Sequence, residues 1–242
     1  MRSSNPVFRT LERSEAYEGT EVATYRGIVG KTATLLLTAV ISGYLAITYI
    51  PIESLYPLLI ASVIIALISV IVSSRSPRLA MPFALIYALS EGVLLGVITL
   101  LINSFVPGVA VAAIIGTASI FTVMLFLYSS RTIRVTSRFR KIMYSILLAF
   151  LVFFILFGIL NLFTNVFSDL TFSAPLALGI SGILIVFGAL LLALDFDRAE
   201  TIVESGADKS YEWVVAVGLM VTIVWIYIEL LRFLAIFASS RR

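Results

Sequence analysis

Long apolar runs separated by short polar breaks dominate the chain. Seven runs approach or exceed the roughly 20 apolar residues that a helix needs to cross a bilayer. We expect these spans to cover Thr32–Ile50, Pro57–Ser73, Leu79–Ile102, Val106–Tyr128, Ile142–Thr164, Ala174–Asp195 and Trp213–Phe237. The second run is short, so we expect it to take in residues of the preceding Ile52–Tyr56 turn. The pattern predicts an all-α fold, a polytopic membrane bundle of seven transmembrane helices.

The composition supports a membrane protein and narrows its chemistry. Hydrophobic residues make up 60% of the chain and charged residues 13%, with a mean hydropathy of +1.09, which excludes an ordinary soluble domain. The chain has no cysteine and no histidine, so disulfides, haem ligation and the common zinc sites are excluded. Carboxylates are the groups left to titrate near neutral pH. We expect no cofactor and no enzyme activity.

The basic residues predict how the chain is oriented. Every Lys and Arg from Arg2 to Lys209 lies in the N-terminal tail or in the second, fourth or sixth connection. The positive-inside rule therefore places the N-terminus in the cytoplasm and, after seven spans, the C-terminus outside. Arg241 and Arg242 leave a re-entrant seventh segment as an alternative. The basic residues form no continuous stripe, so we expect the lipid bilayer as a partner and no nucleic acid.

The predicted spans also divide the chain into two parts. Residues 1–28 are expected to form a cytoplasmic N-terminal tail, a solvated arm that mixes four arginines with four glutamates. Residues 29–242 are expected to form the transmembrane domain. The localisation that follows is a multi-pass protein of the inner or plasma membrane.

The stretch LALDFDRAE places two aspartates, Asp195 and Asp197, where the sixth span is expected to end at the cytoplasmic headgroups. They either end the helix in water or form the mouth of an ion path, where both become candidate calcium ligands. An EF-hand loop is excluded because its turn glycine and bidentate carboxylate are missing. Only Arg198 and Lys209 oppose the acidic vestibule expected here, which consists of Asp195, Asp197, Glu200, Glu204, Asp208 and Glu212.

Two further carboxylates, Glu91 and Glu229, lie well inside apolar segments. Each costs roughly 2.5–3.5 kcal/mol on an insertion scale if it stays charged near the midplane. Glu229 has Arg232 three residues later on the same helix face, so an intrahelical ion pair is its ordinary structural explanation. Glu91 has no such partner in its own helix. It flanks a strip of small residues, so we expect its side chain to point into the bundle; the strip is Ala88, Gly92 and Gly96.

Several motifs give the chain a family resemblance. NPVF, TYRGIVGKT, EGVLLG, LDFDRAE and YEWVVAVGLMVTIVWIYIELLRFL occur in this order and cover most of the chain. Together they resemble the Bax inhibitor-1 family, specifically its bacterial Bax-inhibitor-1-like (YccA-like) branch. The resemblance implies a seven-helix bundle with the last helix central. It also implies a calcium leak controlled by a proton-sensitive pair of carboxylates, one at the end of helix six and one in helix seven.

The resemblance transfers to this chain position by position. Asp195 corresponds to the helix-six aspartate of the family, and Asp197 is an added neighbour. The family places its second aspartate about ten residues before the arginine of a Leu-Leu-Arg ending, and counting back from Arg232 gives Thr222. Aligning IYIE with the Leu-Tyr-Leu-Asp of the family gives Glu229 instead. The sensor of this chain is therefore either Asp195 with Asp197, or a deeper Glu91–Glu229 pair.

Either pair predicts a gate. Two carboxyl groups in contact can share one proton, and losing it leaves two charges that repel and that offer oxygen ligands to Ca²⁺. We therefore expect a pH-sensitive calcium leak channel that closes on acidification. The alternatives are a proton-coupled transporter and a membrane protein that binds or modulates a membrane-bound AAA protease, the latter implied by the resemblance. A retinal protein is excluded because the seventh span has no lysine for a Schiff base.

Overall fold

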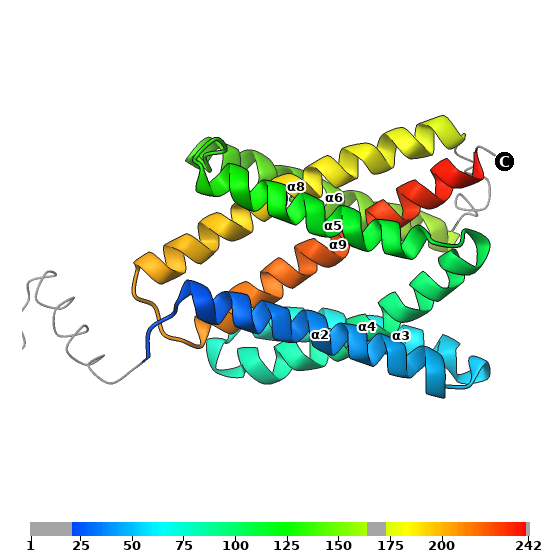
Figure 1. The fold of residues 1–242 in the computed structure, drawn as a ribbon, viewed down its shortest axis with the longest axis horizontal. Coiled ribbons are helices and arrows are strands. Elements are labelled where there is room, and N and C mark those ends of the chain that lie inside the picture. Colours follow the sequence, from blue (N-terminus) through cyan, green and yellow to red (C-terminus); the bar gives the residue numbers. More distant parts are fainter. Residues whose placement is uncertain (1–20, 164–172, 241–242) are drawn as a thin grey trace, which may run out of the picture.

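A computed structural model describes residues 21–163 and 173–240 as a bundle of long helices (Figure 1). The helices are α2 (Tyr25–Tyr49), α3 (Ile52–Arg75), α4 (Ala80–Phe105), α5 (Val109–Ser129), α6 (Ser137–Phe163), α8 (Ala174–Glu204) and α9 (Tyr211–Ser239), with a short 3₁₀ turn, η1 (Pro77–Leu79), before α4. In this part of the chain, seven helices are long and apolar enough to cross a membrane. The predicted fold class is confirmed. Most of the expected tail, residues 1–20, lies outside the described residues.

Helix α9 is the centre of the bundle. It packs against α2, α3, α4, α5 and α8, and Figure 1 shows it crossing between the α2–α3–α4 group and the α5–α6–α8 group. More of α9 is buried inside the bundle than of any other described membrane-spanning helix, 56% of its apolar window. Met220 of α9 is buried in one apolar cluster with residues of α2 and α4, and Val215 and Ile226 are buried in another with residues of α8. The expectation of a central last helix is confirmed.

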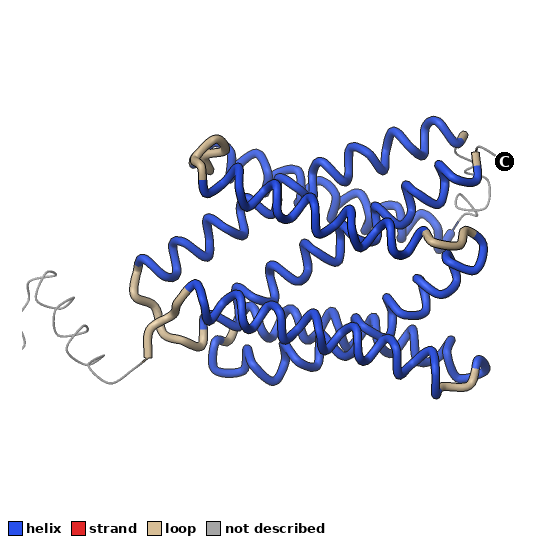
Figure 2. The backbone as a smooth tube through the Cα atoms, in the orientation of Figure 1, coloured by secondary structure: helices blue, strands red, loops and turns tan. Residues whose placement is uncertain are grey.

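The helices alternate in direction, so the start of α2 and the C-terminus lie at opposite ends of the bundle (Figure 1). The loops in Figure 2 gather at these two ends. We call the end that holds the start of α2 and the connections 76–79, 130–136 and 205–210 the basic end, because the arginine-bearing connections meet there. Helix α9 runs without interruption from this end to the other. The alternative of a re-entrant seventh segment does not fit such a helix.

Helices α2 and α4 approach each other closely through small residues. A Cβ atom built on Gly92 would lie 2.2 Å from the carbonyl oxygen of Ala39, and one on Gly43 would lie 2.6 Å from the carbonyl oxygen of Gly92. Only glycine fits at such distances, which brings the two backbones into contact. The close packing predicted for the small-residue strip of α4 is confirmed. Glu91 beside it is 9% exposed, so its side chain points into the bundle, as expected.

Helix α8 extends well beyond the predicted span. The expected boundary at Asp195 is wrong, because α8 ends only at Glu204. The residues after Asp195 keep an apolar face, since Phe196 and Ala199 are buried in a cluster with Val215 of α9. This packing outweighs the charges, which lie on other faces of the same turns. Helix α6 covers the outer side of α8, where the Phe150 and Phe187 rings meet edge to face.

Candidate functional site

Asp195 lies in the contact between α8 and α9. The hydroxyl of Thr222 in α9 donates a hydrogen bond to Asp195 Oδ2 at 2.5 Å. Gly218, one turn earlier in α9, leaves room for the carboxyl group, since a Cβ there would lie 3.6 Å from Asp195 Oδ1. Asp195 is nine residues before the end of α8, or about 14 Å at the helical rise. The carboxyl is therefore partly buried within the bundle, more than two turns before the end of α8.

Asp197 and Asp195 do not face each other. Residues two apart in a helix point to different sides, and Asp197 Oδ2 lies 3.7 Å from Nε of Arg140 in α6. Arg198, which is exposed and lies three residues after Asp195 in α8, interacts electrostatically with Asp195. Across the described residues no group of three or more Asp, Glu, His or Cys side chains could hold a metal ion. Each aspartate thus has its own partner on a different helix.

Glu229 lies farther along the same contact of α8 and α9. Its Oε1 is 4.0 Å from Nη1 of Arg232, so the predicted intrahelical ion pair is confirmed. Its Oε2 is buried without a hydrogen-bond partner among the described residues, and so are Ser181 Oγ of α8 and Trp225 Nε1. Trp225 stands one turn before Glu229 and packs close to Gly188 of α8. The α8–α9 contact therefore carries polar groups at two depths along the helices. Asp195 and Thr222 lie at one depth, and Glu229 lies at the other.

Glu91 and Glu229 are not a pair. By helix rise from the basic end, Glu91 lies about 17 Å along α4, whereas Glu229 lies about 27 Å along α9. Glu91 has no hydrogen-bond or ion-pair partner in the described part of the chain, and its electrostatic neighbour is Tyr87, one turn earlier. The structure therefore separates the two deep carboxyl groups that the sequence brought together as one candidate sensor.

The basic end holds a buried ion pair that the sequence analysis missed. Glu212, the second residue of α9, is 1% exposed, and its Oε2 lies 2.8 Å from Nζ of Lys31 in α2. The backbone N–H of Thr24 donates to Glu212 Oε1 at 2.7 Å, and the Thr24 hydroxyl donates to the same oxygen at 3.1 Å. A Cβ on Gly27 would lie only 2.1 Å from that carboxylate. We call these four residues the clasp, because they join the starts of α2 and α9.

Backbone pairing extends the clasp to the chain before α2. Val22 and Asp208 form an antiparallel bridge, and the N–H of Ala23 donates to the carbonyl of Ala207 at 2.8 Å. The Lys209 ammonium lies 2.5 Å from Glu21 Oε2, and this contact raises the pKa of Lys209. Hydrogen bonds from Ser210 lower the pKa of Asp208. The segment before α2 is thus fixed on the α8–α9 connection.

More basic residues oppose the expected acidic vestibule than Arg198 and Lys209, because three of its six carboxylates are paired with other bases. Glu200 is bound by the Tyr128 hydroxyl and the Arg131 guanidinium. Glu212 is neutralised by Lys31, and Asp197 faces Arg140. These basic residues come from α2, from the α5–α6 connection and from the first turn of α6, so their distance in sequence concealed the pairing. The sequence did contain one signal of the Lys31–Glu212 pairing. Lys31 in TYRGIVGKT is a lysine at the start of an apolar helix.

Comparison with known families places the chain. Residues 5–239 match the family described as Bax inhibitor 1 like. The chain belongs to that family. No curated protein matches this Bax inhibitor 1 like chain. The match extends over all seven helices and over the clasp.

The geometry decides between the two alignments of the helix-seven position in this Bax inhibitor 1 like chain. Thr222, counted back from Arg232, is the residue that contacts Asp195. Glu229 lies two turns farther along α9, beside Arg232. Of the two candidate positions, Thr222 is therefore the one whose side chain contacts the Asp195 carboxyl.

Proposed function

We propose that the protein is a pH-sensitive calcium leak channel of the cell membrane, of the bacterial branch of its family, in which protonation of Asp195 controls the path. The observation that supports this most is the carboxyl group of Asp195 between α8 and α9, with a single hydroxyl as its hydrogen-bond partner. Ionisable residues at membrane depth mark ion paths in many proteins. Carboxylate oxygens are also the ligands that Ca²⁺ prefers.

In this proposal, the charge of Asp195 controls the cation flux. Ionised Asp195 attracts cations to the α8–α9 contact, whereas protonated Asp195 leaves that contact neutral. The Thr222 hydroxyl can donate to the ionised carboxylate and accept from the protonated one, so it holds the side chain in place in both states. Cation flux therefore rises as pH rises.

Glu229 extends this path toward the other end of the bundle. Unpartnered polar atoms at membrane depth cost several kcal/mol each, and Ser181 Oγ, Trp225 Nε1 and Glu229 Oε2 lie buried without hydrogen bonds from the described residues. Water that bridged them would satisfy these atoms, and three polar partners are typical of a buried water. A hydrated contact at this level provides the outer part of the route, with Asp195 at the inner part.

The experiment is calcium flux into liposomes that contain only this protein, measured from mildly acidic to mildly alkaline pH. We expect flux that increases with pH and does not require a pH gradient. Saturable uptake that is driven by a proton gradient would instead identify a proton-coupled transporter. Zero flux at every pH, with folded protein confirmed by circular dichroism, would contradict the channel.

Zero flux would favour the second candidate, binding or modulation of a membrane-bound AAA protease. The observation in its favour is that the clasp and the Val22–Asp208 bridge fix the segment before α2 at the basic end. A fixed segment presents the residues before it at one defined face. Removal of residues 1–20 would then abolish co-purification with the protease while leaving the bundle folded.

A further inference from the structure

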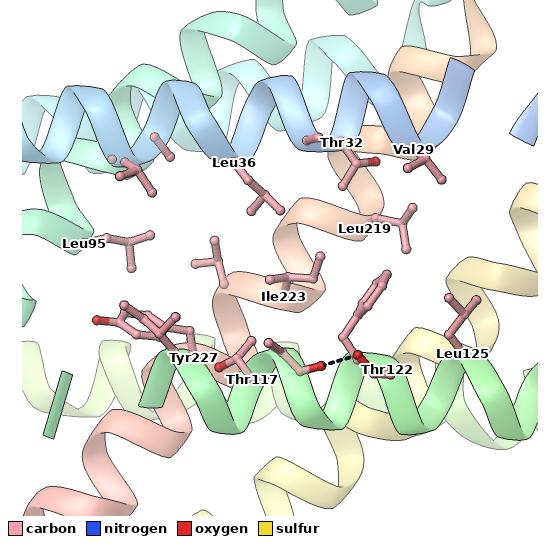
Figure 3. Close-up of a pocket in the computed structure, with 18 of the residues that line it drawn as sticks. Val29, Thr32, Leu36, Leu95, Thr117, Thr122, Leu125, Leu219, Ile223 and Tyr227 are labelled. Carbon is pink, nitrogen blue, oxygen red and sulfur yellow. Dashed lines mark hydrogen bonds between the residues drawn. The ribbon is translucent and has the colours of Figure 1, made fainter. Parts of the chain in front are cut away.

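A large cavity of the described chain lies between α2 and α5. Its volume is about 1090 Å³, just above the roughly 300–1,000 Å³ that is typical of small-ligand pockets. Figure 3 shows Leu36 of α2, Leu95 of α4 and Leu125 of α5 around it, with Ile223 and Tyr227 of α9 between the walls. We call this cavity the α2–α5 slot. Asp195 and Thr222 do not line it.

The slot is as long as the apolar part of a bilayer. On α2 its lining runs from Tyr25 to Ile47, which is about 33 Å at the helical rise. The hydrocarbon core of a bilayer is roughly 30 Å thick. Val40 and Ile114, on the two walls, are 69% and 58% exposed, so the slot is open to the side. An elongated ligand that enters from the membrane fits this shape.

The threonine and Tyr227 hydroxyls along the slot already have partners. The hydroxyls of Thr32, Thr117 and Thr122 donate to carbonyls of their own helices, and Figure 3 shows the Thr122 bond. The hydroxyls of Thr99 and Tyr227 bond to each other at 2.8 Å. Water or an ion in this cavity would lose its hydrogen bonds to bulk water and would gain few new ones, because the hydroxyls there are already bonded. Its interior therefore suits hydrocarbon.

The mouth of the slot at the basic end differs from the interior of the slot. Both charged residues among the described lining residues lie at this mouth. Arg131 and Glu200 form an ion pair there, beside the Tyr128 hydroxyl. Arg131 has φ of 58°, and it is the sole non-glycine residue of the described ranges in the left-handed region. Such backbone strain persists where the surrounding structure enforces it, and it gathers at functional sites. Opposite charges thus stand side by side where a lipid headgroup would lie.

We propose that the α2–α5 slot binds a phospholipid whose zwitterionic headgroup ends in a primary ammonium. The phosphate lies on the Arg131 guanidinium, the ammonium donates to Glu200, and the acyl chains fill the slot. Arginine matches phosphate by bidentate hydrogen bonds. A purely anionic headgroup would meet the charge of Glu200, and a choline headgroup has no N–H to donate to it. The lipid enters sideways between α2 and α5.

The test is mass spectrometry of phospholipid retained by the purified full-length protein, after incubation with an equal mixture of phosphatidylethanolamine, phosphatidylcholine and phosphatidylglycerol. Ala118→Phe fills the slot from α5, and Ala33→Phe fills it from α2. Ala112→Phe is the matched control, because Ala112 is exposed on α5 outside the slot. Circular dichroism and size-exclusion chromatography confirm that each variant is folded.

We expect wild type and Ala112→Phe to retain phosphatidylethanolamine in preference to the other two lipids. Ala118→Phe and Ala33→Phe should lower retention several-fold, and Glu200→Gln should remove the preference for ethanolamine over choline. Equal retention in the filled variants and in wild type would overturn the proposal. Retention without any headgroup preference in wild type would also overturn it. Cysteines introduced at the slot that crosslink to a second copy of the chain would overturn it as well, because they would identify a protein partner.

Discussion

Thr222 donates a hydrogen bond to Asp195 across the contact of α8 and α9, with 2.5 Å between the two oxygens. The contact joins one titratable group to one group that does not titrate near neutral pH. A pair of carboxylates opens by mutual repulsion, whereas this pair changes by a single charge. In the proposed function, the pH response of this chain would therefore depend on how strongly that charge attracts cations.

Replacement of the carboxyl tests its role directly. Asp195→Asn keeps the shape of the side chain and removes its charge, so calcium flux in liposomes should become nearly independent of pH. Asp197→Asn is the matched control, because Asp197 lies on another face of α8 near Arg140. It should keep the pH response. A protein that conducts with unchanged pH dependence after Asp195→Asn would contradict the assignment.

Thr222→Asp should turn the contact into a carboxylate pair. Two adjacent carboxyls share a proton at low pH and repel each other once it is lost, so flux should depend more steeply on pH than in wild type. Thr222→Val separates this effect from loss of the hydrogen bond, since it adds no charge. The measurement is calcium flux against pH for the three proteins. If Thr222→Asp and Thr222→Val respond to pH alike, charge repulsion plays no part.

The clasp should stabilise the fold. Removing one partner of a buried ion pair leaves an unpaired charge, so Lys31→Met and Glu212→Gln should each lower the free energy of unfolding by about 3–5 kcal/mol. The double variant should lose less than the sum of the single losses, because neither charge is then left alone. Denaturant unfolding in detergent micelles measures all four proteins. Additive losses would show that the Lys31–Glu212 contact contributes little.

The charges of Lys209 and Asp208, which lie beside the clasp on the α8–α9 connection, should not affect pH sensing near neutrality. The pKa of Lys209 is raised above 10.5, so its contribution to stability is present below that pH and is lost only as pH rises through the raised value. The pKa of Asp208 is lowered below 3.8, so its contribution is present above that pH and is lost only on acidification through the lowered value. Lys209→Gln and Asp208→Asn should therefore leave the midpoint of the flux curve unchanged. A shifted midpoint of the flux curve would place the pH sensor at Lys209 or Asp208.

The orientation in the membrane can be tested with fused reporters. The concentration of arginines at the basic end predicts that this end faces the cytoplasm. A reporter in the Ser129–Lys141 region should then report the cytoplasm, and one fused after Arg242 should report the outside. The two fusions are controls for each other, because α9 ends at the opposite side of the bundle from the basic end. Two reporters on the same side would contradict the seven-pass topology.

The sequence by itself determined the fold class, because membrane helices must satisfy their backbone hydrogen bonds internally and must be about as long as the bilayer is thick. Both requirements appear as apolar runs of countable length. Local spacing also determined the Glu229–Arg232 pair and the Gly92 contact face, since residues three or four apart share a helix face. The short length of the second apolar run predicted that its helix would take in residues before Pro57, and α3 begins at Ile52.

Tertiary structure alone decided which charges from distant parts of the chain meet. Lys31 and Glu212, or Arg131 and Glu200, are far apart in the chain, and nothing in their local sequence specifies the partner. The length of α8 was also decided by packing, because Phe196 and Ala199 are buried against other helices and continue the helix past Asp195. Finally, the choice of Thr222 over Glu229 as the partner of Asp195 rests on the crossing of α8 and α9, which brings two particular turns together.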